Sequence, residues 1–437
     1  MNDRAGAAAW TVSVTLVSAA AQLLQISVAA RFLTPAEFGV LAIVNVMLFV
    51  IAAFQDMGLS SYCVHLGEAP RRSHSTLFWI STGLGAAGAL IVLAIARPVA
   101  AFYGMPGLVP LLELLSVNFI VIGLGGQYQA NYIRVFQATR LAQIELGARL
   151  SGLVLVLWLL GEGWGPLAIV SGMLVFATLK LLLLAAFAPY EWHPGLMFDR
   201  GLAPRALRYG IFQAGTQLVS QLRMQADQLI VGKALGPEML GVYALAKDLI
   251  GYPLRFVQPL MARLTLPALA FHQKDTTALR AEFVRGLRTT AIFCGVIYAG
   301  LAMLAPWVVR ILYGEGFAAV AALVPLMTLF GALRPLGQNT GMLAQATGRT
   351  RNEFTWNLRV SLVTWIPNLL IAAIAPSLTA FALALSLIQV AVTLLAYPLF
   401  VRPLEPIGMG RYVGSWILPA GVALLASASA WAIGGAT

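Results

Sequence analysis

The chain has 437 residues, of which 59% are hydrophobic and only 10% are charged, and its mean hydropathy is +0.83. A water-soluble domain needs more polar surface than this composition supplies, so the sequence indicates a protein that crosses a membrane many times. The formal net charge is +11. Such a charge is compatible with nucleic-acid binding or with the topology of a membrane protein, and the distribution of the cations along the chain distinguishes the two.

Apolar segments near the length of about 20 residues that a spanning helix needs recur along the whole sequence. We expect an all-α polytopic fold of twelve core helices and one additional terminal segment. The predicted spans are approximately 10–30, 38–60, 76–96, 108–129, 144–161, 164–188, 207–230, 239–262, 288–312, 317–345, 355–375, 377–400 and 412–433.

Arginine and lysine gather in alternate loops. If the N-terminus is cytoplasmic, nineteen of them fall in inside loops and four in outside loops, and the remaining five of the 28 lie in predicted spans. This excess on one side is the positive-inside pattern of membrane proteins. It predicts a cytoplasmic N-terminus and no nucleic-acid partner.

Two stretches half a chain apart, Leu33–Ala42 and Leu235–Ala244, are identical at five of ten positions at an offset of 202. Further matches in the same order, such as Gln137–Thr139 with Gln345–Thr347, indicate an internal duplication. We predict two six-helix bundles, 1–200 and 201–405, with 406–437 as an additional transmembrane segment. Because six is even, the halves are expected to be parallel repeats related by an axis along the membrane normal, as in some transporters.

Polar side chains line one face of the span at 207–230 and, more narrowly, one face of its counterpart at 10–30. Polar groups in hydrocarbon are costly, so such stripes mark either a hydrated cavity or contacts between helices, and both interpretations stay open. The candidate cavity-lining side chains are Gln22, Gln25, Asn45, Gln213, Gln217 and Gln221.

Charged residues inside the predicted spans concentrate in the second half. At the offset of 202, Arg223 corresponds to Ala21 and Lys247 to Asn45, so the repeat is not symmetric in charge. A net-positive wall suits an anionic cargo, because guanidinium groups bind phosphate or carboxylate oxygens in a bidentate manner. Internal salt bridges or snorkelling side chains are the alternative. The candidate cargo-binding cations are Arg223, Lys247, Arg255 and Arg334.

Two carboxylates accompany these cations. Asp227 lies four residues after Arg223, a spacing that allows the two to pair on one helix face, and Asp248 lies on nearly the same face as Arg255. Either carboxylate is a candidate for coupling transport to an ion gradient by protonation. A neighbouring cation that neutralises it is the simpler alternative.

The sequence shows little sign of catalytic chemistry. It contains no Walker A motif, no Gly-rich nucleotide loop outside a span and no His or Cys spacing typical of a metal site. A membrane glycosyltransferase or polymerase would be expected to carry acidic catalytic residues on large external loops, whereas the predicted external loops have only a few residues. We therefore predict a protein that is not an enzyme and that uses neither a cofactor nor a metal.

The run Ala30–Ala42, followed by Gln55–Leu59, resembles the N-terminal signature of bacterial polysaccharide flippases of the Wzx type. Asp227–Pro237 with Gly241–Tyr243 resembles the second-half counterpart of that signature. These flippases belong to the multidrug/oligosaccharidyl-lipid/polysaccharide (MOP) exporter superfamily. The resemblance implies two pseudo-symmetric MATE-like helix bundles around a central cavity and transport by alternating access.

The cargo that the resemblance implies is an undecaprenyl-diphosphate-linked oligosaccharide. It would move from the cytoplasmic to the periplasmic leaflet of the bacterial inner membrane, for exopolysaccharide, capsule or O-antigen (lipopolysaccharide) assembly. A polysaccharide polymerase and glycosyltransferases are the expected protein partners. A peptidoglycan-precursor flippase and a multidrug antiporter of the same superfamily remain alternatives, although an antiporter for cationic drugs would favour acidic cavity groups.

Overall fold

Helices make up almost all of the described chain. The computed structural model describes residues 2–56, 59, 63, 70–189, 193–273, 275–347, 350–405 and 407–434, and none of these lies in a β-strand. The chain forms two compact units, unit 1 (Met1–Leu222) and unit 2 (Arg223–Thr437). The division falls inside a long helix, whereas the boundary expected from the repeat, between residues 200 and 201, lies in the loop before that helix. The two units do not test the predicted limits of the repeats, so those limits remain a prediction.

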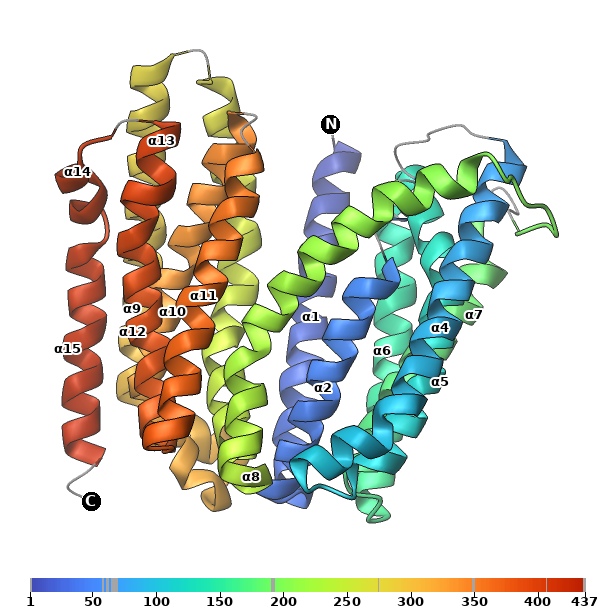
Figure 1. Cartoon of the computed structure of the whole chain (residues 1–437), viewed down its shortest axis with the longest axis horizontal. Coiled ribbons are helices and arrows are strands. Elements are labelled where there is room, and N and C mark those ends of the chain that lie inside the picture. Colours follow the sequence, from blue (N-terminus) through green and yellow to red (C-terminus); the bar gives the residue numbers. More distant parts are fainter. Residues whose placement is uncertain are drawn as a thin grey trace. The chain divides into compact units, whose positions relative to one another are not determined.

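Unit 1 is a bundle in which α5 packs against α4 and α7, and α6 packs against α1 and α7 (Figure 1). The first part of α8 completes the unit. The helices are α1 (Asn2–Phe32), α2 (Pro35–Asp56), α4 (Arg71–Tyr103), α5 (Leu108–Arg134), α6 (Ala138–Gly161), α7 (Pro166–Ala186) and α8 (Leu202–Phe271).

Unit 2 is organised around α10, which packs against α9, α12 and α15 (Figure 1). The predicted terminal segment is α15, and its contacts with α9 and α10 make it an integral part of the unit. The remaining elements after α8 are α9 (Thr276–Tyr313), η2 (Glu315–Phe317), α10 (Ala318–Ala346), α11 (Thr350–Ile374), α12 (Leu378–Ala396), η3 (Tyr397–Val401), α13 (Arg402–Leu404), α14 (Met409–Gly414) and α15 (Ile417–Gly434).

The duplicated turn has a different construction in each half. In the first half, Thr34 and Glu37 form a capping box before α2, because the Thr34 amide donates to Glu37 Oε2 at 2.8 Å and the Glu37 amide donates to Thr34 Oγ1 at 3.4 Å. In the second half, Gly236 breaks α8 at φ 82° and ψ −178°. In both halves a proline follows, at Pro35 and at Pro237, where its missing N–H costs nothing at a helix start.

Ten helices in the described parts of the chain are long and apolar enough to cross a membrane. The predicted number is thirteen. The break at Gly236 divides α8 into two of the predicted spans, and the predicted first and last spans correspond to α1 and α15. The helix order therefore agrees with the prediction, and the protein is a multi-pass membrane protein.

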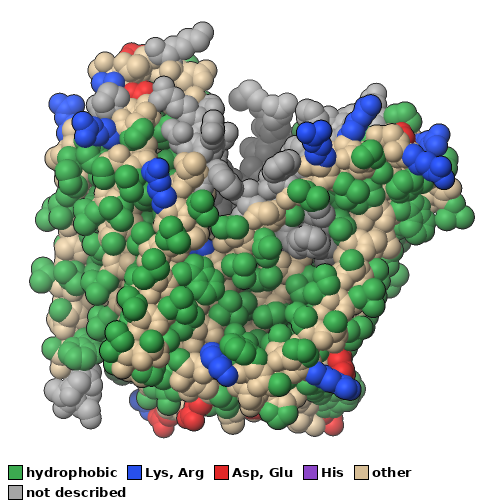
Figure 2. All heavy atoms as spheres, viewed as in Figure 1, with side chains coloured by type: hydrophobic (Ala, Val, Ile, Leu, Met, Phe, Trp, Pro, Cys, Tyr) green, Lys and Arg blue, Asp and Glu red, His purple; other side chains and the backbone are tan. Residues whose placement is uncertain are grey.

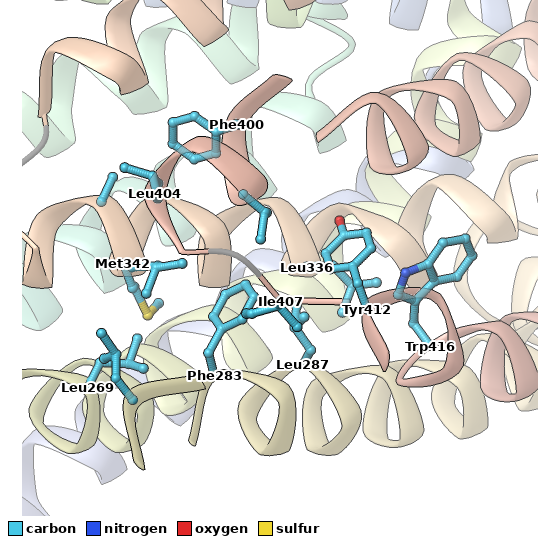
Figure 3. Close-up of a cluster of buried hydrophobic side chains, with 14 of the residues drawn as sticks. Leu269, Phe283, Leu287, Leu336, Met342, Phe400, Leu404, Ile407, Tyr412 and Trp416 are labelled. Carbon is cyan, nitrogen blue, oxygen red and sulfur yellow. The ribbon is translucent and has the colours of Figure 1, made fainter. Parts of the chain in front are cut away.

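A large apolar cluster stabilises unit 2 where α9, α10 and the C-terminal helices meet (Figure 3). Phe283 and Leu336 are fully buried or nearly so, and the aromatic residues Phe400, Tyr412 and Trp416 pack around them. The Tyr412 hydroxyl donates to the Thr393 carbonyl at 2.9 Å, so its polar atom is satisfied inside the cluster. The flanks of the helices in Figure 2 carry mainly hydrophobic side chains, and charged side chains gather near helix ends.

Candidate functional site

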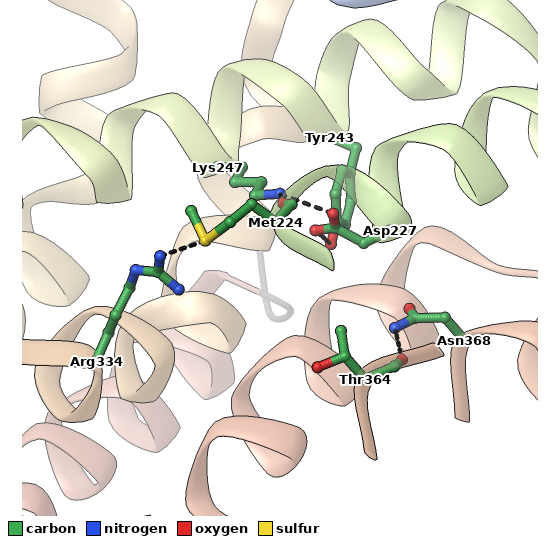
Figure 4. A network of polar contacts seen from close by, with 7 residues as sticks. All are labelled: Met224, Asp227, Tyr243, Lys247, Arg334, Thr364 and Asn368. Atoms are coloured by element: carbon green, nitrogen blue, oxygen red, sulfur yellow. Dashed lines mark hydrogen bonds and ion pairs between the residues drawn. The ribbon is translucent and has the colours of Figure 1, made fainter. Parts of the chain in front are cut away.

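A buried ion pair joins the two parts of α8 (Figure 4). Lys247 Nζ donates to Asp227 Oδ1 at 2.7 Å and to the Met224 carbonyl at 2.8 Å, while the Tyr243 hydroxyl donates to Asp227 Oδ2 at 2.7 Å. Asp227 is only 3% exposed. The break at Gly236 allows Tyr243 and Lys247, four residues apart on one helix face, to reach the same carboxylate.

The predicted pairing of Arg223 with Asp227 was wrong. In unit 2 the ion-pair partner of Asp227 is Lys247, and the Arg223 Nη2 atom lies 3.5 Å from Asn357 Oδ1. The helical spacing made a pair possible, but the second part of α8 supplies a lysine and a tyrosine that occupy both carboxylate oxygens. Among the described residues, the buried Nε atom of Arg223 has no hydrogen-bond partner.

Arg334 on α10 approaches the same place. Its Nη2 atom donates to the sulfur of Met224, and its guanidinium carbon lies 5.2 Å from the ring centre of Phe330. Met224 therefore contacts two cations, Lys247 through its carbonyl and Arg334 through its sulfur (Figure 4). Three of the four cations predicted from the sequence thus come together in unit 2.

These side chains line a cavity of about 40 Å³ within unit 2. Its described lining contains three cations, Arg223, Lys247 and Arg334, and one carboxylate, Asp227. A buried water molecule needs at least about 10–15 Å³, so in this conformation the cavity has space for a few waters and for no large anion. The other lining residues come from α8, α10, α11 and α12 and are Met224, Phe330, Val360, Thr364, Asn368, Leu385, Ile388, Gln389 and Val392.

Helices α11 and α12 add polar groups that the sequence analysis missed. Asn368 is 2% exposed, and its Nδ2 atom donates to the Thr364 carbonyl at 2.7 Å. Its Oδ1 atom is buried and has no hydrogen-bond partner in the part of the chain that the structure describes. Gln389 lines the cavity from α12. The sequence feature that could have revealed these groups is the i, i+4 spacing of Thr364 and Asn368 in an apolar span, beside Pro367.

Arg255, the fourth predicted cation, belongs to a different group. It pairs with Asp248 at 3.9 Å, as its position on the same face predicted, and its guanidinium lies 5.0 Å from the ring centre of Tyr252. Both charged side chains are nearly half exposed, at 46% and 44%. Neither is among the described residues that line the cavity. Cargo binding by Arg255 and ion coupling by Asp248 stay predictions.

The predicted polar stripe residues lie in unit 1, whereas the cavity lining lies in unit 2. Gln22 and Gln25 on α1 and Asn45 on α2 are half-buried. At the start of α8, Gln221 is half-buried and Gln217 is exposed, and the side chain of Gln213 lies outside the described residues. Their role in lining a hydrated cavity remains a prediction.

Comparison with protein families gives one match, described as "Polysaccharide biosynthesis protein", over residues 28–322. The amylovoran biosynthesis protein AmsL of Erwinia amylovora is 40% identical over 360 residues, which are 82% of this chain and 92% of that protein. The lipopolysaccharide biosynthesis protein WzxC of Escherichia coli K12 is 26% identical over 429 residues, which are 98% of this chain and 87% of that protein.

Among solved structures, the lipid II flippase MurJ in its inward closed conformation superposes with a TM-score of 0.75. The alignment covers 97% of each chain at 14% sequence identity, so it shows the fold alone. The predicted fold, that of MOP superfamily transporters, is confirmed.

Proposed function

Because the chain belongs to the polysaccharide biosynthesis protein family and has the fold of MOP transporters, we propose that it flips an undecaprenyl-diphosphate-linked oligosaccharide across the membrane. The proposed direction is from the cytoplasmic to the periplasmic leaflet of the bacterial inner membrane, with the N-terminus in the cytoplasm. The product would serve exopolysaccharide, capsule or O-antigen assembly. Relatives named for amylovoran and lipopolysaccharide biosynthesis support this class of cargo.

The observation that carries the proposal is the charge of the cavity in unit 2. Three cations and a single carboxylate line it in the described residues, inside a membrane protein, where unpaired charge is costly. An anion that enters the cavity loses its hydration shell and gains charge-assisted hydrogen bonds from the three cations. Guanidinium groups such as those of Arg223 and Arg334 match two phosphate oxygens at once.

In this proposal the diphosphate occupies the cavity only after it widens, because the present volume of about 40 Å³ is too small. Before cargo arrives, Asp227 and the Met224 carbonyl hold the Lys247 ammonium group. The cargo phosphate competes with Asp227 for that ammonium group, while the polyprenyl tail stays in lipid. The cycle is alternating access, so no covalent bond forms or breaks and the protein is not an enzyme.

The alternatives differ in cargo or in chemistry. An antiporter for cationic drugs is disfavoured by the excess of cations over carboxylates in the cavity. A peptidoglycan-precursor flippase would carry another diphosphate-linked lipid, so only a cargo assay separates it from the proposed function. A membrane glycosyltransferase or polymerase is expected to act on sugars in purified form, whereas we propose that such enzymes are partners of this protein.

The experiment compares Arg223→Ala, Lys247→Ala and Arg334→Ala with the unchanged protein for polymer export in cells. Each charge-assisted hydrogen bond is worth about 1.5–3 kcal/mol, so we expect roughly tenfold or greater loss of transport rate per amount of protein in the membrane. Lys180→Ala is the matched control, since Lys180 is also a cation inside a span but pairs with Glu145 in unit 1 at 2.6 Å.

A second measurement uses purified protein in proteoliposomes with a diphosphate-linked oligosaccharide lipid. Transfer between leaflets without change to the glycan is the expected result, and the three variants should slow it. Normal transfer by all three variants would contradict the cationic-cavity proposal. Glycan extension by the purified protein alone would contradict the proposal that it is a transporter.

A further inference from the structure

Residues 193–199 of the loop between α7 and α8, which belong to its described part, are fastened along the first turns of α4 by seven hydrogen bonds within unit 1. Figure 1 shows this loop, in green, beside the start of α4. The bonds run from Arg71 Nε and Nη2 to His193 O (3.3 and 3.0 Å), Arg72 Nε and Nη2 to Phe198 O (3.3 and 3.0 Å), Trp79 Nε1 to Gly195 O (3.0 Å), Gly195 N to Ser75 Oγ (3.0 Å) and Asp199 N to Thr76 Oγ1 (2.8 Å).

The order of these bonds fixes the direction of the loop. His193 is held by Arg71, whereas Gly195 is held both by Ser75 Oγ, four residues or about 6 Å farther along the helix, and by Trp79 Nε1 from the following turn. The chain then returns, so that Phe198 is held by Arg72. The loop therefore descends beside α4 and turns back, with its tip next to the second and third turns of the helix.

The tip consists of three consecutive apolar residues that the described chain does not cover. Leu196 is 94% exposed, Met197 39% and Phe198 45%. Trp79, which holds the loop, is itself 38% exposed. An isolated exposed apolar residue is ordinary, but a rigidly held tip with three of them marks an interaction surface.

The position of the tip along α4 indicates what covers it. This helix has 33 residues, or about 50 Å, and the hydrocarbon core is about 30 Å thick, so the ends of the helix extend beyond the core. Its first six residues are polar or charged, and its apolar run begins at Leu77. The tip follows Gly195, which Ser75 and Trp79 hold at the start of this apolar run, and therefore lies at the boundary between water and hydrocarbon, the depth at which tryptophan is enriched in membrane proteins.

The charged residues near the loop also favour a lipid bilayer as the surface that covers the tip. Four exposed arginines lie close to the loop: Arg71 and Arg72 on α4, which bind it, and Arg200 and Arg205 at and after its C-terminal end. Cations beside an apolar tip suit a leaflet that contains anionic phospholipids, since the head groups meet the guanidinium groups while the tip enters the region of the acyl chains.

We propose that Leu196, Met197 and Phe198 insert into the interface of the phospholipid leaflet that surrounds the N-terminal end of α4. By the positive-inside pattern this is the cytoplasmic leaflet. The anchor also places the start of α8, because Asp199 Oδ1 accepts hydrogen bonds from the amides of Gly201 at 2.9 Å and Leu202 at 3.2 Å. This inference is independent of the proposed cargo.

The test places a single environment-sensitive fluorophore on Leu196→Cys in the full-length protein, in nanodiscs that contain phosphatidylcholine and phosphatidylglycerol. The native Cys63 and Cys294 are both buried. We expect blue-shifted emission, strong quenching by lipids brominated near the head-group end of the acyl chain, and protection from aqueous iodide. Phe198→Cys provides a second site if the first variant is poorly folded.

Two positions in unit 1 calibrate the measurement. Leu90→Cys, at a residue of α4 that is 67% exposed, reports the lipid-facing limit, and Glu162→Cys, in the exposed turn after α6, reports the aqueous limit. A signal at position 196 that matches the Glu162 site overturns the proposal. Protection of position 196 from both iodide and brominated lipid also overturns it, because it means that protein covers the tip.

Discussion

Lys247 Nζ lies 2.7 Å from Asp227 Oδ1, and the two side chains are 12% and 4% exposed. The pair connects the part of α8 before Gly236 to the part after it, and Tyr243 binds the second oxygen of the same carboxylate. Removing one partner of such a pair leaves an uncompensated buried charge, which costs more than the pair itself contributes. The ion pair is therefore a structural element of the cavity as well as a source of its charge.

A double-mutant cycle tests that role. Asp227→Asn and Lys247→Met should each lower the free energy of unfolding by about 3 kcal/mol, and the double variant should lose clearly less than the sum. Unfolding of the detergent-solubilised protein measures it. Breaking the exposed Arg285–Glu282 pair, 3.0 Å long, by Arg285→Ala should cost less than about 1 kcal/mol. Additive losses at positions 227 and 247 would argue against a buried pair.

Tyr243→Phe removes only the hydroxyl that donates to Asp227. A hydrogen bond to a charged acceptor contributes about 1.5–3 kcal/mol, so this variant should lose more stability than Tyr298→Phe. The Tyr298 hydroxyl donates at 2.6 Å to a neutral acceptor, the Ile250 carbonyl. Both tyrosines are fully buried, so the two unfolding curves are a fair comparison. Equal losses would contradict a charge-assisted hydrogen bond between Tyr243 and Asp227.

Gly236→Ala tests the backbone of the duplicated turn. At φ 82° an L-residue is strained although nothing lies within 4 Å of the added Cβ, so we expect a loss of about 1–2 kcal/mol. Gly251→Ala, also in α8 and also with free space, should instead stabilise the protein by about 0.5–1 kcal/mol, because the helical backbone there suits alanine. Thermal unfolding of both variants should therefore shift in opposite directions.

Gly331→Ala tests the packing of α10 against α9. A Cβ at this position would overlap the Tyr298 ring, which is fully buried and is held by its hydrogen bond to the Ile250 carbonyl. Overpacking of this kind costs about 1–3 kcal/mol. Gly337→Ala, on the same helix with nothing within 4 Å, is the control. A neutral Gly331→Ala variant would mean that the helices separate easily at this contact.

Some residues of the candidate site could be predicted from the sequence and others could not. Lys247 and Arg334 were identifiable because a cation inside an apolar segment is rare and costly. The partner of Asp227 could not be identified from the sequence, since the i, i+4 spacing favoured Arg223. In the structure, Lys247 and Tyr243 reach Asp227 from the part of α8 that follows the break at Gly236. Asn368 and Gln389 were missed because a single amide in an apolar span equally suits a helix contact.

Sequence patterns were enough to predict an all-helical membrane protein, an internal duplication and an excess of charge in the second half of the chain. These properties follow from hydropathy, periodicity and cation counts, which depend on neighbours along the chain. The folded chain was needed to show that Arg223, Lys247 and Arg334 share one cavity and that Arg255 is not among the described residues that line it. The rotation of each helix about its axis determines such groupings. That rotation depends on packing between segments far apart in the sequence, such as those of Arg223 and Asn357, which are 134 positions apart, so a local sequence pattern cannot predict it.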